Sequence, residues 1–191
     1  KPISLEEFRT FAREFNVVPV AESFLADNET PLTLYSKLTA NQENTFLLES
    51  ADQGEVTGRY SFIGVDRQWR LSSRNGAVNA EGIEVPPVSQ PLRALKVAMG
   101  APRVNIPEGM PDFIGGAVGF VAYDYVRQLE HVSDTEREAL WPDFDFQCPA
   151  AVVIVDHFRH VTTIAVPFAL RSDIDASLQH ATALRDGIEE L

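Results

Sequence analysis

The feature that most limits how this chain can fold is the stretch Arg74-Asn75-Gly76-Ala77. Asn-Gly accepts positive φ at both central positions of a type I′ turn, which joins two antiparallel strands through a two-residue loop. A loop of this length also fixes which residues face each other across the hairpin. We therefore expect Leu71 to pair with Ala80, and Ser73 to pair with Val78.

The distribution of apolar residues agrees with this turn. Successive side chains on a strand point to opposite faces, so residues two apart share a face. The expected register places four apolar residues on one face of the hairpin: Trp69, Leu71, Val78 and Ala80. Arg70 and Arg74 then point away from that face. Turn chemistry and hydrophobic pattern both predict antiparallel β-structure.

Other strands are expected from short apolar runs bounded by glycine or turn residues. They are residues 45–50, 60–65 and 68–73, with Gly54, Gly58 and Gly64 as breaks, and a second hairpin of residues 150–155 and 161–166. The turn of this second hairpin falls near His157. Residues 115–121 are a further candidate strand.

Helices are expected at both ends of the chain and between the strands. Ser4 with Glu7 has the spacing of a capping box, and Thr30-Pro31 places proline in the first turn of a second helix. Further helices are expected to end at Gly100, to span residues 135–140, and to begin after Ser172. Antiparallel hairpins with helices around them predict an α+β fold, with an antiparallel, sandwich-like sheet core.

The length of 191 residues suits one domain, residues 1–191, with one hydrophobic core. The proline-rich stretches at 86–91 and 101–111 are expected to be loops inside that domain. The final apolar helix runs to Leu191 without a capping residue, so we expect the natural chain to continue.

Composition excludes several classes of partner. Lysine and arginine total 16 against 28 acidic residues, a net charge of −12, which disfavours binding to nucleic acid or anionic membranes. Cys148 is the only cysteine, as is typical of a reducing compartment, and no apolar run approaches the length of a membrane span. A cytoplasmic protein is expected.

The residues contain no complete catalytic arrangement. His157 and His160 flank a turn without a second ligand pair, and Cys148 has no neighbour that would activate its thiol, so no metal site and no catalytic residue are expected. The glycines of residues 115–119 lack the lysine of a P-loop and are expected to allow close backbone packing. Asp143 and Asp145 are expected on a solvated acidic face.

Four segments, in order, resemble one family. They are Leu47-Leu48-Glu49-Ser50, Gly58-Arg59-Tyr60-Ser61-Phe62-Ile63-Gly64, residues 111–120 leading into Ala122-Tyr123-Asp124, and Val155-Asp156-His157. Together they resemble the N-terminal region of anthranilate synthase component I, over nearly the whole chain. That region is similar in aminodeoxychorismate synthase component I, the relative from the folate pathway.

The resemblance implies the role of the longer enzyme. The intact family member is a lyase that binds chorismate and Mg2+ in a large C-terminal lobe and takes ammonia from a glutamine amidotransferase subunit. The catalytic and metal-binding residues belong to that later lobe, which nothing in this sequence matches. No catalytic residue is therefore transferred to this chain, and the chain alone is expected to be inactive.

The resemblance also implies half of a tryptophan-binding pocket used for feedback inhibition. In this sequence its residues are Leu48, Glu49 and Ser50. Glu49 can accept charge-assisted hydrogen bonds from the tryptophan ammonium, Ser50 offers a hydroxyl, and Leu48 offers apolar contact with the indole. The alternative is that Glu49 and Ser50 simply face solvent at the end of a strand.

The partner of the tryptophan carboxylate stays open between two residues. Some family members have a basic residue where Tyr60 stands, whereas here the base is Arg59, one position earlier. Strand neighbours point to opposite faces, so these two side chains are not expected on the same side. A different class of function is a lobe that only holds the catalytic lobe or the amidotransferase subunit.

Overall fold

The computed structural model describes residues 3–25, 29–40, 42–43, 45–50, 58–130, 141–169 and 174–189. The expected helix at 135–140 and the expected cap at Ser172 lie outside these residues.

The chain divides into two compact units, each built from separated segments. Unit 1 contains residues 1–66, 102–115 and 149–191, and unit 2 contains residues 67–101 and 116–148. The expectation of one domain, residues 1–191, stays a prediction.

The described strands form one seven-stranded sheet in which β1, β7, β6, β3 and β2 follow in that order, β4 pairs with β3, and β5 pairs with β6. The strands are β1 (Val17–Phe24), β2 (Phe46–Leu48), β3 (Tyr60–Arg74), β4 (Ala77–Glu81), β5 (Val118–Val121), β6 (Phe144–Asp156) and β7 (Val161–Ala169). The strand pairs for which a register is given are all antiparallel.

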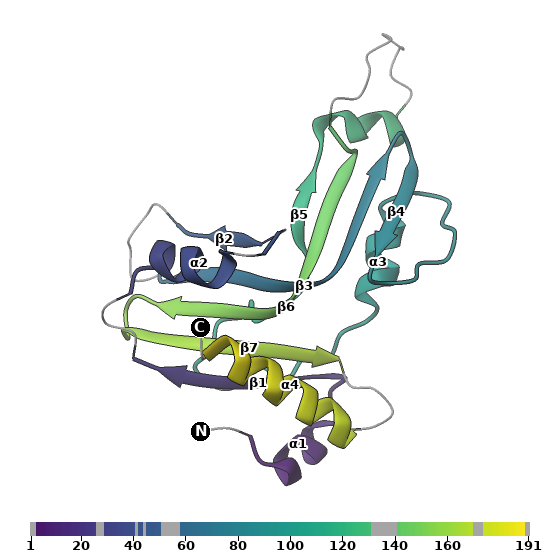
Figure 1. Ribbon diagram of the computed structural model, residues 1–191. Coiled ribbons are helices and arrows are strands. Elements are labelled where there is room, and N and C mark those ends of the chain that lie inside the picture. Colours follow the sequence, from purple (N-terminus) through teal and green to yellow (C-terminus); the bar gives the residue numbers. More distant parts are fainter. Residues whose placement is uncertain are drawn as a thin grey trace. The chain divides into compact units, whose positions relative to one another are not determined.

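The helices are α1 (Leu5–Phe11), α2 (Pro31–Thr39), α3 (Arg93–Met99), a 3₁₀ helix (Tyr123–Gln128) and α4 (Ile174–Glu189). In unit 1, α4 packs on β7 and β1, α1 contacts α4, and α2 contacts β2 (Figure 1). The α+β class is confirmed. None of the helices in the described residues is long and apolar enough to cross a membrane.

The Asn-Gly hairpin has the register expected from its turn. Leu71 pairs with Ala80 and Ser73 with Val78, and both turn residues have positive φ, 51° at Asn75 and 77° at Gly76. The burial is one-sided, since Leu71 is fully buried on β3 whereas Val78 and Ala80 are exposed. The register follows from the turn alone. Which of the two strands is buried depends on the elements that pack against the hairpin.

Both expected N-terminal caps are present. Ser4 and Glu7 exchange hydrogen bonds in a capping box at α1, and Thr30 caps α2 with Pro31 in the first turn. These caps satisfy backbone N–H groups that have no partner inside the helix. The expected end of α3 at Gly100 is also confirmed, with φ of 63° at this glycine.

One expectation about strands was wrong, and one strand was missed. Residues 60–65 and 68–73 belong to one continuous strand, β3, which passes through Asp66 in a left-handed conformation with φ of 52°. Strand β1 was not among the expected strands, and it contains Pro19, a residue that sheets normally admit only on edge strands. It is tolerated because β1 is the first strand in the sheet order and pairs with β7, placing Pro19 opposite Pro167.

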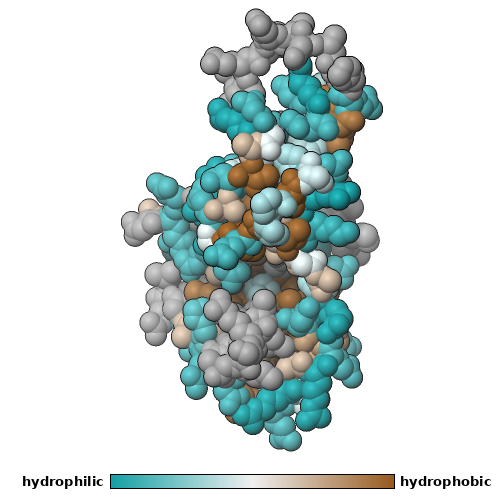
Figure 2. Space-filling model, turned by 90° about the vertical axis from the view of Figure 1, so that its right-hand side faces the viewer, coloured by the Kyte–Doolittle hydropathy of each residue, from teal (hydrophilic) through white to brown (hydrophobic). Residues whose placement is uncertain are grey.

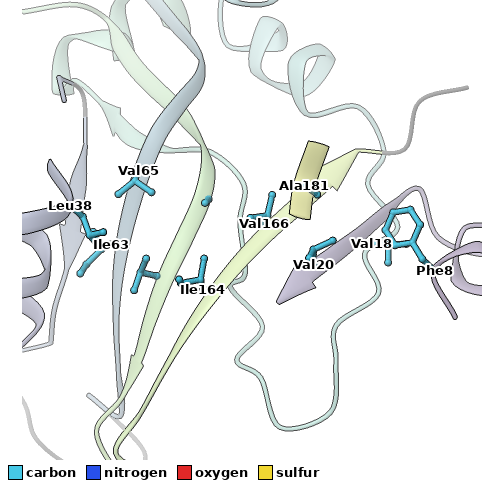
Figure 3. Close-up of a cluster of buried hydrophobic side chains, with 11 residues drawn as sticks. Phe8, Val18, Val20, Leu38, Ile63, Val65, Ile164, Val166 and Ala181 are labelled. Carbon is cyan, nitrogen blue, oxygen red and sulfur yellow. The ribbon is translucent and has the colours of Figure 1, made fainter. Parts of the chain in front are cut away.

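The second hairpin is confirmed, with β6 and β7 joined by a turn at residues 157–160. Unit 1 has its main core on the face of the sheet that the helices cover. Side chains from α1, α2, α4 and the strands meet there, as Figure 3 shows for Phe8 with Val18 and for Leu38 with Ile63. Unit 1 also has a second cluster of buried hydrophobic residues, which includes Ile114 and Ile154.

Unit 2 has a core of its own. Trp69 and Leu71 of β3 and Phe144 of β6 pack with Ala94 of α3 and Tyr125 of the 3₁₀ helix. The ring of Tyr125 meets the ring of Phe144 at 6.3 Å between centroids, in an edge-to-face arrangement. The apolar face of β3 beyond Asp66 therefore packs against other elements of unit 2.

Candidate ligand-binding site

The predicted site begins at β2, which pairs with the start of β3. Phe46 lies opposite Gly64, and its ring occupies the space above that glycine, since a Cβ added to Gly64 would lie 2.1 Å from Phe46 Cε1. An aromatic side chain over a glycine on the neighbouring strand fills the gap that the missing side chain leaves. Gly64 therefore holds β2 in register.

The two leucines of β2 have different roles. Leu47 lies opposite Ile63 and packs against the main core of unit 1. Leu48 lies opposite Phe62 on the other face and is 41% exposed. An apolar side chain left this open is available to contact a ligand or another part of a protein.

Leu48 stands at one end of a row of aromatic rings. Phe62, its partner on β3, has its ring centroid 6.1 Å from that of Tyr60. The Phe62 ring also meets Phe113 edge-on, at 5.2 Å and 86°. Two of the five predicted site residues, Leu48 and Tyr60, are thus linked through Phe62 on one face of the sheet.

Glu49 and Ser50 follow β2 directly and are exposed. They lie past the last residue of β2 that pairs with β3, at Leu48. In sequence they follow Leu48, which lies on the same face as the aromatic row.

Arg59 is held by an acidic residue far along the sequence. Its Nε and Nη2 donate to the two carboxylate oxygens of Asp156, at 3.0 and 2.6 Å. Asp156 Oδ1 also accepts from the backbone N–H of Phe158 and of Arg159. A carboxylate with this many donors is fixed in place, and the two-point geometry is the strongest form of this pair.

The charges of this pair reinforce each other. Burial is the largest single influence on the pKa of Asp156 and raises it, but the hydrogen bond from Arg59, the two backbone N–H groups and the positive charge together lower the pKa below its ordinary value. The hydrogen bond to Asp156 in turn raises the pKa of Arg59. Both side chains are therefore charged at neutral pH.

The expectation that Arg59 and Tyr60 point to different sides was wrong. The Arg59 guanidinium lies 4.8 Å from the centre of the Tyr60 ring and 5.5 Å from that of Phe158. Strand alternation does not apply, because β3 begins at Tyr60 and Arg59 precedes it. The guanidinium is close enough to both rings for cation–π attraction.

A second hydrogen bond between distant residues lies next to the Arg59–Asp156 pair, and sequence reasoning missed it. Ser61, fully buried on β3, is 2.8 Å through its Oγ from Nε2 of His157. The backbone N–H of His157 also donates to the carbonyl of Arg59. The two motifs that contain Arg59-Tyr60-Ser61 and Asp156-His157 therefore form one contact region.

Tyr60 also lines a cavity of about 160 Å³ in unit 1. Its lining comes from β1, the start of β3, the loop at residues 108–111 and the β6–β7 hairpin. The lining includes Asp156 and Arg159, but not Leu48, Glu49, Ser50 or Arg59. Of the five predicted residues, Tyr60 alone belongs to this cavity.

The remaining sequence candidates have structural roles. Asp143 and Asp145 were expected on a solvated acidic face, and this expectation was wrong. Asp143 is buried and accepts hydrogen bonds from Ser73 Oγ and the Gly76 N–H. Asp145 pairs with Arg70. These partners could not be identified before the register of β3 and β6 was known. Gly119 packs against backbone, as expected, since a Cβ there would lie 2.0 Å from the Asp145 carbonyl oxygen.

The described residues offer little for nucleophilic or metal chemistry. Burial raises the pKa of the Cys148 thiol to about 11, and a hydrogen bond with the Gly116 backbone offsets this only in part, so the thiol is protonated at neutral pH. Among the described residues, no group of three or more His, Cys, Asp or Glu is placed to hold a metal ion.

Comparison with known proteins identifies relatives. Anthranilate synthase component 1 of Mycobacterium tuberculosis (strain ATCC 25618 / H37Rv) is 42% identical over 169 residues, covering 84% of this chain and 33% of that protein. The protein of the same name from Thermus thermophilus is 38% identical over 78% of this chain and 32% of its own length. That from Aquifex aeolicus is 32% identical over 99% of this chain and 39% of its own length.

A solved structure has a similar fold. It is a crystal structure of anthranilate synthase component I from Streptococcus pneumoniae TIGR4, with a TM-score of 0.53 and 19% identity over 88% of this chain and 37% of that one. No protein-family model matches the chain. The chain spans about a third of the length of the first of these relatives. By homology, the chain belongs to the anthranilate synthase component I family.

Proposed function

We propose that this chain is the N-terminal, tryptophan-sensing lobe of anthranilate synthase component I. The observation that supports this most is the end of β2. There Leu48 is exposed beside the aromatic row of Phe62 and Tyr60, and the exposed Glu49 and Ser50 follow directly. Apolar contact and a carboxylate thus occur together, as an indole and an ammonium group require.

In this proposal each residue meets one part of tryptophan. Leu48 contacts the indole, Glu49 accepts hydrogen bonds from the ammonium, and Ser50 offers a hydroxyl at the pocket wall. Arg59 is already paired with Asp156, so its role is to hold Tyr60 in position through the stacked guanidinium. Of the two candidates, Tyr60 then remains the one that donates a hydrogen bond to the tryptophan carboxylate.

The affinity requires a second lobe. Burying an indole removes roughly 200 Å² from water, worth about 5 kcal/mol at about 25 cal/mol per Å². Micromolar binding needs about 8 kcal/mol after the costs of association. Contacts from both lobes would supply the difference, and a coupling of about 1–3 kcal/mol between tryptophan and substrate binding is enough for useful inhibition.

The role of the whole protein follows from this assignment. We propose that it makes anthranilate from chorismate and ammonia, the ammonia coming from a glutamine amidotransferase subunit, in the cytoplasm. Mg2+ would be bound by the remaining lobe, as the family resemblance implies. The alternative, aminodeoxychorismate synthase component I, is less favoured, since the relatives compared above carry the anthranilate synthase name.

Substitution of Glu49 in the protein that contains both lobes tests this function. Glu49→Gln removes the charge that would meet the ammonium, a charge-assisted hydrogen bond worth about 1.5–3 kcal/mol. The tryptophan concentration for half-inhibition should then rise by about tenfold or more, while kcat and KM for chorismate stay unchanged. Steady-state assays across a tryptophan series measure both effects.

Glu43→Gln is the matched control, because Glu43 is also exposed and lies just before β2. It should leave inhibition unchanged. If Glu49→Gln behaves like Glu43→Gln, the sensor role is contradicted. If Glu49→Gln instead separates the chain from its catalytic lobe or from the amidotransferase subunit, the lobe serves as a scaffold.

A further inference from the structure

Strand β4 has one free edge. Among the described strands it pairs with β3 alone (Figure 1). In a two-residue turn the carbonyl of the first residue accepts from the N–H of the last, so Arg74 and Ala77 form a hydrogen-bonded pair. Such pairs alternate along antiparallel strands, so Val78 and Ala80 direct their backbone N–H and C=O groups away from β3.

This edge of β4 is accessible. The outward backbone groups of Val78 and Ala80 form no hydrogen bond with any described residue. The side chains of residues 77–80 are exposed as well. Proteins usually protect an edge with proline, lysine, a bulge or a very short strand, whereas β4 is five residues, Ala-Val-Asn-Ala-Glu, in a regular ladder. It is therefore a template on which another strand can pair.

The other strands with a free edge differ from β4. Strand β1 contains Pro19 and is flanked by residues 103–105, whose backbone bonds to that of Val17. Strand β2 has three residues, and β5 contains Gly119 and no charged side chain that would select a partner. The free edge of β4 is thus the one best suited to specific pairing.

The sequence of β4 fits a second copy of itself in one antiparallel register. When Asn79 faces Asn79 of the other copy, Val78 faces Ala80 at two symmetric places. Each of these pairs exchanges both of its backbone hydrogen bonds, so all the outward groups find partners. A shift by two residues instead brings Gly76 or Gly82 opposite the strand, and both of these have left-handed φ and lie outside β4.

The apolar side chains agree with this register. Val78 and Ala80 share a face of β4, and both are exposed in the single chain. In the paired strands Val78 of one copy lies directly beside Ala80 of the other, on the same face, so each covers part of the other. Apolar residues that the hairpin leaves open are thus covered by the second copy.

The charges agree as well. In this register Glu81 of one copy lies beside Ala77 of the other, and Arg74 is the neighbour of Ala77 on β3. Two strand spacings, about 9–10 Å, then separate Glu81 from Arg74, and the small alanine lets these long side chains meet. Arg74 is exposed and forms no hydrogen bond or ion pair with any described residue. Glu81 meets Arg67 within its own chain, and a carboxylate accepts from more than one cation.

We propose that two copies of this chain pair through β4, antiparallel and centred on Asn79, so that their sheets join. Two-fold symmetry closes the contact, and association stops at a dimer. The contact uses none of Leu48, Glu49 and Ser50. It therefore does not depend on the proposed tryptophan-sensing function.

Disulfide cross-linking of the 191-residue chain tests the register. Asn79 faces its own copy in a pair without backbone hydrogen bonds, where the Cα atoms are about 4.5 Å apart, within disulfide range. Asn79→Cys should therefore cross-link under mild oxidation at least about tenfold faster than Ala77→Cys or Glu81→Cys alone. A mixture of Ala77→Cys with Glu81→Cys should give the mixed dimer. The unaltered chain is the control for Cys148, its only thiol.

Sedimentation equilibrium tests the contact without cross-linking. The unaltered chain should show a monomer–dimer equilibrium with Kd below about 1 mM. The N–H of Val78 points away from β3, so Val78→Pro removes a donor from the free edge and keeps the ladder to β3. This variant should raise the dimer Kd at least about tenfold, whereas the matched control Val78→Thr, which keeps the N–H, should leave it unchanged. Circular dichroism checks that both variants fold.

Two results would overturn the β4 dimer. One is that Asn79→Cys cross-links no faster than Ala77→Cys and Glu81→Cys alone, which is a test that does not involve proline. The other is association that Val78→Pro leaves unchanged in a folded chain, because the contact would then belong to other exposed side chains.

Discussion

At the scale of single residues, Asp156 explains most of the local geometry. Its carboxylate accepts from Arg59 and from the backbone N–H groups of Phe158 and Arg159, so one side chain joins the start of β3 to the turn after β6. Arg59, thus fixed, lies against the Tyr60 ring. Charged and aromatic residues of two separate motifs are therefore positioned by one acid.

The first prediction concerns Asp156 and pH. Its folded pKa is lowered, so its contribution to stability is present above the unfolded value of about 3.9 and is lost as the pH falls through the folded pKa. Asp156→Asn should lower the free energy of unfolding at pH 7 by about 1–3 kcal/mol. It should also flatten the loss of stability below about pH 4.

Urea unfolding of both proteins at pH 7 and pH 3 measures this difference. Asp112→Asn is the control, since Asp112 is exposed and forms no described hydrogen bond or ion pair, and it should leave stability nearly unchanged. Equal slopes of stability against pH for Asp156→Asn and the unaltered chain would contradict the assigned role.

At the scale of secondary-structure elements, glycine decides where strands can approach. Gly64 receives the ring of Phe46 and fixes β2 on β3, while Gly119 lets β5 lie against β6. In each case the strand pair requires the absence of a side chain, and not an unusual φ. The glycines of two family motifs are thus explained by packing between strands.

The next prediction compares two glycines of unit 2. In Gly119→Ala the new Cβ would lie 2.0 Å from a backbone oxygen of β6, so β5 must shift, and the cost should be about 3 kcal/mol or more. In Gly100→Ala nothing lies within 4 Å, and only the backbone is strained, because φ of 63° with ψ of −141° is a conformation found almost only for glycine, at about 1–3 kcal/mol.

Urea unfolding ranks the two variants, and the order is the decisive result. Gly119→Ala should be the less stable. If Gly100→Ala were as destabilising as Gly119→Ala, backbone strain rather than the contact between β5 and β6 would dominate.

At the scale of the whole molecule, the described residues of the chain present exposed apolar surface. The large exposed apolar side chains of unit 2 include Val97, Phe120, Tyr123, Leu129 and Trp141. Figure 2 looks onto the side that carries α3 and shows apolar side chains gathered among hydrophilic ones. The relatives are about three times as long as this chain.

The last prediction follows from that surface. At high concentration the 191-residue chain should self-associate, because exposed apolar patches drive contact between copies despite the net charge of −12. Light scattering coupled to size exclusion should show an average mass that rises with concentration. Tyr123→Ser combined with Trp141→Ser should reduce the rise, and a constant monomer mass for the unaltered chain would contradict it.

The sequence by itself determined the local features of this protein. The register of the Asn75-Gly76 hairpin followed from turn chemistry, the caps at Ser4 and Thr30 from the hydrogen bonds that helix ends require, and the α+β class from the spacing of apolar residues. Each depends on residues within a few positions of one another, where the backbone leaves few alternatives.

Only the tertiary structure decided which distant side chains meet. Arg59 pairs with Asp156, 97 positions away, and Ser61 with His157, because β3 lies beside β6 in one particular register. No local pattern encodes that choice of partner. The same holds for the cavity beside Tyr60, whose walls come from segments that are adjacent only after folding.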